Sequence, residues 1–192
     1  LDAPVGIHRR DELGELARSF ETMQLRLQTD ELTGLLNREA FTLKLRSRIA
    51  AYGGDRRKRR FAVLFIDLNK FKQVNDELGH DAGDLALKEV ANRLRESLRT
   101  EDLVARYAGD EFVILLDNID ASDHFVQARS TIQRIFSEPL ESVGTENKLE
   151  LGASVGIAVY PDDATDAEAL LRIADGIMYD HKLGDRKRTQ DS

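Results

Sequence analysis

One short stretch, residues 106–112, constrains the fold more than any other part of the chain. Two adjacent acids, Asp110 and Glu111, follow an Ala-Gly step and separate two apolar runs, 103–107 and 112–116. Apolar runs on both sides of a small turn are typical of a β-hairpin, so the acids are expected at its tip. The sequence therefore predicts two neighbouring strands with two carboxylates where the chain reverses.

A third acid, Asp67, ends another apolar run, residues 61–66. A carboxylate at the edge of a core is costly unless it is paired or binds a cation. If this run and the hairpin lie side by side, Asp67 converges with Asp110 and Glu111. Oxygen ligands of this kind hold hard divalent cations, so the pattern predicts a cation site at this end of the sheet.

The remaining segments alternate between helix and strand patterns. Four segments have the apolar periodicity of helices: 38–52, 83–99, 122–137 and the segment from residue 165 onward. A further strand is expected over 149–160. This order suits an α+β fold in which helices flank a mixed central sheet, related to the ferredoxin-like layout. The polar segment 68–84 is expected outside the core, beyond the end of a buried strand, where α/β proteins commonly bind ligands.

Residues 11–28 form a separate unit. Its apolar residues recur at intervals of three and four, in the order Leu13, Leu16, Phe20, Met23 and Leu27. This a/d seam is typical of a two-stranded coiled coil, and we favour a parallel dimer. Because the seam covers little more than two heptads, a plain amphipathic helix packed on its own domain stays open as the alternative.

Composition excludes several classes of protein. The 192 residues are 41% hydrophobic and 33% charged, which suits one well-filled domain with an appendage. A net charge of -7 argues against binding nucleic acid polymers through the whole surface. The chain has no Cys and therefore no disulfide, which is compatible with a reducing cytosol. No apolar run approaches the roughly 20 residues of a membrane span, so the chain as given is expected to be soluble.

Several motifs between residues 30 and 188 carry a resemblance to a known family. They occupy residues 30–38, 67–84 and 106–112, residues 154–158 with Pro161, and Ala174, Asp175, Met178, Tyr179 and Lys182 near the end of the chain. In this order they resemble the GGDEF domains of diguanylate cyclases. Residues 11–27 resemble, over a shorter and less specific stretch, the second helix of a HAMP module. The expected domains are a HAMP-like helix and linker at 1–29 and a cyclase domain at 30–192.

The resemblance implies a site for Mg²⁺, with Mn²⁺ as the second candidate. Asp67, Asp110 and the backbone carbonyl of Leu68 would hold the metal, and Asp110 and Glu111 would be the catalytic acids. The family motifs imply further residues for substrate: Asn75 and Asp84 at the guanine edge, His80 at a substrate position, Lys182 and Arg186 at the terminal phosphates, the backbone of Lys70, Phe71 and Lys72 around them, and Gly109 in the hairpin.

The resemblance also implies a reaction and a palm-like cyclase fold. Each protomer of a homodimer would bind one GTP, and each 3′-hydroxyl would attack the α-phosphate held by the facing protomer. The products would be cyclic di-GMP and two pyrophosphates. The N-terminal helix would regulate the reaction by raising the effective concentration of one half-site near the other. The chain would be a cytoplasmic domain of an inner-membrane protein whose spanning segments lie upstream.

A second site is implied by Arg99, Asp102 and Arg106, which resemble the family's product-inhibition site for cyclic di-GMP. Arginine forks and a carboxylate suit guanine edges and phosphates. The plainer interpretation is a helix C-terminus stabilised by Arg99, followed by a strand that starts after Asp102.

Three departures from the family pattern bear on activity. Ala108 replaces the first glycine of the hairpin motif, and its methyl group would weaken turnover if that position required φ > 0 or a close approach of ligand. Asn69 stands where an acid is frequent. Gly184 precedes Asp185, whereas the family usually has Gly directly before the arginine. The alternative function is therefore a catalytically weak module that binds GTP or cyclic di-GMP as a regulator.

Overall fold

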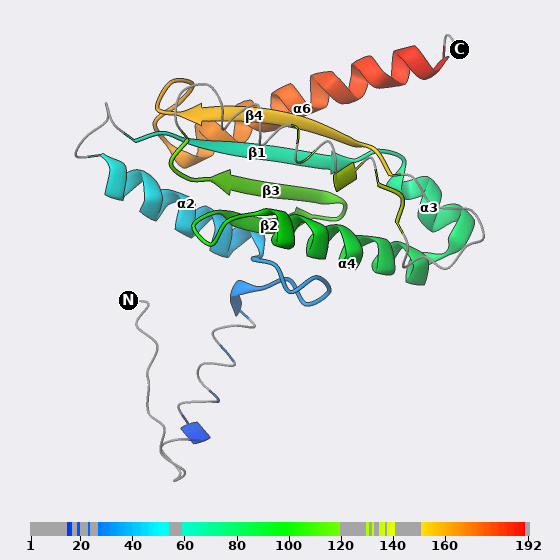
Figure 1. The fold of residues 1–192 in the computed structure, drawn as a ribbon, viewed down its shortest axis with the longest axis horizontal. Helices are drawn as coiled ribbons and strands as arrows, with labels where there is room; N and C mark the ends of the chain where they lie inside the picture. The colour runs from blue at the N-terminus through cyan, green and yellow to red at the C-terminus, as the bar shows by residue number, and fades with distance from the viewer. Residues whose placement is uncertain are drawn as a thin grey trace.

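The computed structural model describes residues 27–53, 59–119, 138–140 and 151–190, with the separate positions 15, 16, 19, 23, 130, 132, 135 and 136, but not the side chains of 185–190. Its sheet is built from β1 (Phe61–Leu68), β2 (Leu103–Ala108), β3 (Glu111–Leu116) and β4 (Ala153–Tyr160). The strand order is β2-β3-β1-β4, and each neighbouring pair is antiparallel (Figure 1). β1 therefore lies inside the sheet, between β3 and β4.

Helices cover both faces of this sheet, and the predicted α+β fold class is confirmed. The described helices are α2 (Arg38–Tyr52), α3 (Phe71–Leu78), α4 (His80–Ser97) and α6 (Ala167–Gln190). Among the described residues, the parallel component of the sheet is limited to an isolated bridge between Leu36 and Ala105. Within the described part of the chain, no helix is long and apolar enough to cross a membrane.

β1 is buried at every position because it has a helical layer on each side. Leu64 and Ile66 belong to the core that contains α3 and α4, whereas Val63 and Phe65 belong to the core that contains α2 and α6. This alternation assigns each residue of the strand to one face. Asp67 follows the same alternation and lies on the α2 and α6 face of the sheet.

Several predicted boundaries need correction. The helix expected to begin at Gly83 begins at His80, and β4 begins at Ala153 rather than at residue 149. The segment expected to stay outside the core forms α3, which buries Phe71 and Val74. Because α3 places only these two apolar side chains in the core, polar residues dominate its sequence and hide the helical pattern.

Two predicted elements lie largely outside the described residues. The helix expected over 122–137 is described only at separate positions. Of the predicted coiled-coil seam, Leu16, Met23 and Leu27 are described, and all three are exposed; Leu13 and Phe20 lie outside the described residues.

Candidate active site

The carboxyl end of β1 and the β2–β3 hairpin meet at one edge of the sheet. Asp67 pairs in register with Glu111 of β3 and with Ser154 of β4. The backbone N–H of Leu68 donates to the carbonyl oxygen of Asp110 at 3.2 Å, which fastens the hairpin tip to the end of β1. The structure therefore brings together the acids that the sequence places more than 40 residues apart.

The register separates the roles of the two hairpin acids. Side chains of directly opposed residues in an antiparallel pair lie on the same face of the sheet. Glu111 is therefore the cross-strand neighbour of Asp67, whereas Asp110 lies in the turn and reaches β1 through its backbone. The family resemblance implies Asp67, the Leu68 carbonyl and Asp110 as the metal ligands, and the register adds Glu111 as a carboxylate directly opposite Asp67.

Burial and mutual repulsion disfavour the charged forms of Asp110 and Glu111. The pKa of Asp110 is raised, mainly by burial and then by the charge of Asp67. Burial likewise raises the pKa of Glu111, and repulsion from Asp67, Asp175 and Asp110 adds to the increase. Asp67 itself is only 5% exposed. A bound cation would relieve all of these costs together.

Lys182 places a positive charge beside Asp67. Its Nζ lies 2.6 Å from Oδ1 of Asp67. The approach of α6 depends on Gly156 of β4, because a Cβ at that position would stand 1.9 Å from the carbonyl oxygen of Ala174. His181 adds a second link through an Nδ1 contact of 2.8 Å with the carbonyl oxygen of Val155. Close packing of α6 on β4 thus delivers Lys182 to Asp67.

The hairpin tip is held by Gly109 and Arg106. Gly109 has φ +47°, the left-handed conformation that favours glycine. Ala108 lies in β2 without a positive φ, so the first condition under which it would weaken turnover is not met. Nε of Arg106 donates to the carbonyl oxygen of Gly109 at 2.8 Å, and its Nη1 lies 3.2 Å from Oδ1 of Asp30. Arg106 is therefore committed to the turn and to Asp30.

The residues expected around the phosphates surround the start of α3. Lys70 has φ 62° and precedes the helix without a side-chain cap. Its carbonyl oxygen accepts from the N–H groups of Gln73 and Val74, so the first turn begins at Phe71 and Lys72. Helix N-termini of this kind bind anions. Nearby, Asn69 closes the turn after β1 by accepting a 2.8 Å hydrogen bond from the hydroxyl of Ser154.

Asn75 and Asp84, the residues expected to contact the guanine edge, lie on α3 and α4, which pack against each other. A Cβ on Gly83 would lie 1.9 Å from Oδ1 of Asn75, so only glycine leaves room for the Asn75 side chain. Asp84 is the next residue of α4 and is exposed, as is His80 at the helix start. Sequence analysis treated Gly83 only as a helix start and missed this packing role.

Two of the expected product-inhibition residues, Arg99 and Asp102, lie at the opposite end of the sheet, whereas the third, Arg106, lies at the hairpin end. Oδ2 of Asp102 accepts the N–H of Arg99, and its Oδ1 accepts the N–H of Asp117, each at 3.0 Å. Burial raises the pKa of Asp102 although the Arg99 N–H favours its charged form. The Arg99 side chain is exposed. The side chain of Arg186, the expected phosphate ligand, lies outside the described residues.

The donor set fits a metal that arrives with its nucleotide. In the described residues, no three His, Cys, Asp or Glu side chains converge into a preformed metal cage. Mg²⁺, however, is usually held by one or two carboxylates together with substrate phosphates and water. Asp67, Glu111 and the carbonyl of Leu68 meet that requirement.

Two protein-family models match the chain. The model of the diguanylate cyclase GGDEF domain matches residues 27–188. The chain belongs to this family. The HAMP domain model matches residues 1–29.

Relatives and solved structures agree with the GGDEF assignment. The chain is 42% identical over 162 residues to MucR of Pseudomonas aeruginosa, a bifunctional diguanylate cyclase and cyclic di-GMP phosphodiesterase. It is 37% identical over 189 residues to the diguanylate cyclase TpbB of the same species. These matches cover 84% and 91% of this chain but only 23% and 43% of the relatives. The coiled coil and GGDEF domain of DgcB from Caulobacter crescentus, solved with c-di-GMP, superimposes with a TM-score of 0.77 at 27% identity and covers 90% of each chain.

Proposed function

We propose that this GGDEF domain is an active diguanylate cyclase that condenses two GTP into cyclic di-GMP and two pyrophosphates between facing protomers. The observation that carries the proposal is the buried Asp67, placed opposite Glu111 and contacted by Lys182. A buried acid with an acidic cross-strand neighbour has little structural use, whereas it suits a metal and a triphosphate.

The metal is assigned to Asp67, the Leu68 carbonyl and Glu111, with Asp110 beside them. When bound, Mg²⁺ would neutralise phosphate charge and favour deprotonation of the attacking hydroxyl. Lys182 lies close enough to this group to serve either Asp67, as in this structure, or a neighbouring phosphate. Most of the rate enhancement in phosphoryl transfer comes from such positioning and electrostatics.

The remaining residues orient GTP. The carboxylate of Asp84 would accept hydrogen bonds from the N–H groups of the guanine edge, and the amide of Asn75 would donate to a guanine acceptor. His80 lies at the start of the same helix as Asp84. The backbone at Lys70 to Lys72 and the side chains of Lys182 and Arg186 would hold the outer phosphates.

The chemical step forms one bond and breaks one bond at each α-phosphorus. The 3′-oxygen of one GTP bonds to the α-phosphorus of the facing GTP as the bond to the pyrophosphate oxygen breaks. Asp110 or Glu111 would accept the proton of the attacking 3′-hydroxyl. Two such steps yield the cyclic product.

The N-terminal segment is assigned to dimerisation and regulation. Nδ2 of Asn37, the N-cap of α2, donates to the carbonyl oxygen of Leu27 at 2.8 Å, so Leu27 is attached directly to the domain. The exposed Leu16, Met23 and Leu27 leave an apolar seam for a second copy. With the HAMP match, this supports a cytoplasmic domain tethered to a membrane through segments upstream.

The test is direct synthesis. The chain is incubated with GTP and Mg²⁺ at a protein concentration that favours dimers, and nucleotides are resolved by chromatography. We expect cyclic di-GMP and pyrophosphate in a ratio of about one to two, as the reaction requires. Asp110→Asn should lose activity while its circular dichroism spectrum is unchanged. Absence of any cyclic dinucleotide would overturn the enzyme assignment and favour the second candidate, a GTP or cyclic di-GMP binding regulator.

Product inhibition through Arg99 and Asp102 is a separate proposal. Wild type and Arg99→Ala would be titrated with cyclic di-GMP during turnover. Weaker inhibition of the variant is expected, because the Arg99 guanidinium is exposed and can pair with a phosphate. Equal inhibition of both proteins would remove this role.

A further inference from the structure

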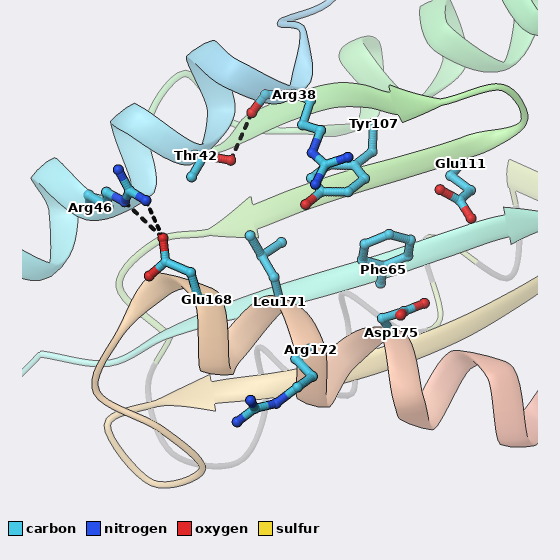
Figure 2. A pocket seen from close by; sticks show the side chains of 10 residues that line it. All are labelled: Arg38, Thr42, Arg46, Phe65, Tyr107, Glu111, Glu168, Leu171, Arg172 and Asp175. Carbon is cyan, nitrogen blue, oxygen red and sulfur yellow. Dashed lines mark hydrogen bonds and ion pairs between the residues drawn. The ribbon is translucent and has the colours of Figure 1, made fainter.

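A cleft of about 540 Å³ opens between α2 and α6 on the sheet face that carries Asp67. Figure 2 shows Glu111 and Asp175 at the end nearer the hairpin, and the ion pair of Arg46 with Glu168 at the other end. Because Glu111 lines the cleft and is also the cross-strand neighbour of Asp67, the cleft adjoins the proposed metal site. Its volume suits one small ligand.

The floor of the cleft offers a stacking surface. The guanidinium of Arg38 lies 4.7 Å from the ring centroid of Tyr107. The Tyr107 ring in turn packs edge-on against Phe65, with centroids 5.0 Å apart. Arg38 is exposed, so the outer face of its planar guanidinium is open to a further flat group. Nucleobases stack on such guanidinium planes as well as on aromatic rings.

Polar groups that suit a guanylate line the same cleft. Arg46 is already paired with Glu168, whereas Arg172 makes no ion pair or hydrogen bond within the described residues. Its guanidinium fork matches a phosphate. Asp175 is exposed at the end shared with Glu111, and a carboxylate can accept two hydrogen bonds from the N–H groups of a guanine edge.

We propose that the cleft between α2 and α6 is a second guanylate-binding subsite, which holds one guanylate unit of cyclic di-GMP on the same protomer. The base stacks on Arg38, its donor edge meets Asp175, and a phosphodiester lies toward Arg172. The proposal rests on the proposed function, because its ligand is the product of that reaction. Product bound here overlaps Glu111 and competes with GTP.

The experiment measures binding rather than turnover. Cyclic di-GMP is titrated by calorimetry into the Arg99→Ala protein, so that the separate site at Arg99 does not contribute. Adding Arg38→Ala should weaken binding about tenfold or more, as expected for loss of a charged and stacked contact. Arg38→Lys keeps the charge without the planar face and should fall between the two. Arg172→Ala should also weaken binding.

Two controls separate the cleft from the primary site. Arg46→Ala removes the same charge at the far end of the cleft, where it is already paired, and should change affinity less than about twofold. A non-hydrolysable GTP analogue with Mg²⁺ should bind the Arg38→Ala protein as tightly as it binds the parent. Thermal unfolding checks that each variant folds.

Three results would overturn the proposal: no binding of cyclic di-GMP in the Arg99→Ala background, equal binding with and without Arg38→Ala, or a parallel loss of GTP analogue binding. Failure of the wild type to synthesise cyclic di-GMP would instead overturn the proposed function. The cleft would still be tested by the binding measurements.

Discussion

Two buried aspartates at opposite ends of the same sheet have opposite environments. Asp117, just beyond β3, is 7% exposed and is paired with Arg48, with the hydroxyl of Tyr52 and with the N–H of Asn118. Asp67, at the end of β1, is 5% exposed and contacts Lys182, but it also repels Asp110 and Glu111.

The comparison shows that burial of a charge does not by itself mark a functional site. A buried carboxylate with a full set of donors holds elements together, as Asp117 joins the end of β3 to α2. A buried carboxylate that raises the pKa of its acidic neighbours leaves an electrostatic deficit that a ligand can fill. The two aspartates should therefore respond to mutation in opposite ways.

Asp67→Asn should give the largest effect, which is on activity. A metal contributes several kcal/mol of transition-state stabilisation, so turnover should fall by about 100-fold or more. The free energy of unfolding should change little, because the substitution also removes repulsion with Glu111. Steady-state synthesis of cyclic di-GMP and denaturant unfolding measure the two quantities. An active Asp67→Asn protein would break the contrast.

Asp117→Ala should show the converse pattern. Removing one partner of a buried pair leaves Arg48 without its carboxylate, and such losses cost about 3–5 kcal/mol of unfolding free energy. Turnover per folded molecule should stay within about twofold, since Asp117 lies at the other end of the sheet. Urea unfolding, with turnover assayed well below the midpoint, tests both parts. A stability loss below about 1 kcal/mol would contradict the structural role.

The pH dependence of stability should reveal the unfavourable electrostatics of Asp110 and Glu111. In the folded protein, the pKa values of Asp110 and Glu111 lie above their usual 3.8 and 4.5. Between each usual value and the raised one, the folded state binds more protons than the unfolded state, so the free energy of unfolding falls as pH rises. Thermal unfolding with a chelator, from about pH 4 to pH 7, should follow this direction.

The matched variant for that measurement is Asp110→Asn combined with Glu111→Gln. In this double variant the contribution of the two acids to the pH dependence of unfolding should disappear. The fall in the free energy of unfolding with rising pH should therefore be smaller than in the wild type. Identical profiles would mean that the two acids carry no electrostatic cost in the folded state.

The smallest expected effects concern the hairpin glycine pattern. Gly109→Ala should cost about 1–2 kcal/mol, because a left-handed φ disfavours a Cβ although no atom lies within 4 Å of it. Ala108→Gly should cost about 0.5–1 kcal/mol through backbone entropy alone. Its turnover should change by less than about threefold, since Ala108 has an ordinary strand conformation. A large gain in turnover would show that the Ala108 methyl group obstructs ligand.

Sequence reasoning gave α2 its observed bounds and gave the hairpin and the buried strand bounds within two residues of those observed, because each is defined by neighbours in the chain. Residues 61–66 are continuously apolar since β1 is covered on both faces, and Asn37 caps α2 through the 2.9 Å hydrogen bond from the N–H of Ala40. α3 was not recognised because its apolar positions are too few for a periodic signal.

The sequence by itself determined which chemical groups are present and that Asp67, Asp110 and Glu111 end or join apolar strands. Only the tertiary structure decided that Glu111 is the acid opposite Asp67, since that depends on strand register. It also decided that Lys182, 115 residues away, reaches Asp67, because the missing Cβ of Gly156 lets α6 pack closely on β4. Local patterns report burial and periodicity, whereas contacts between distant segments depend on how closely their backbones approach.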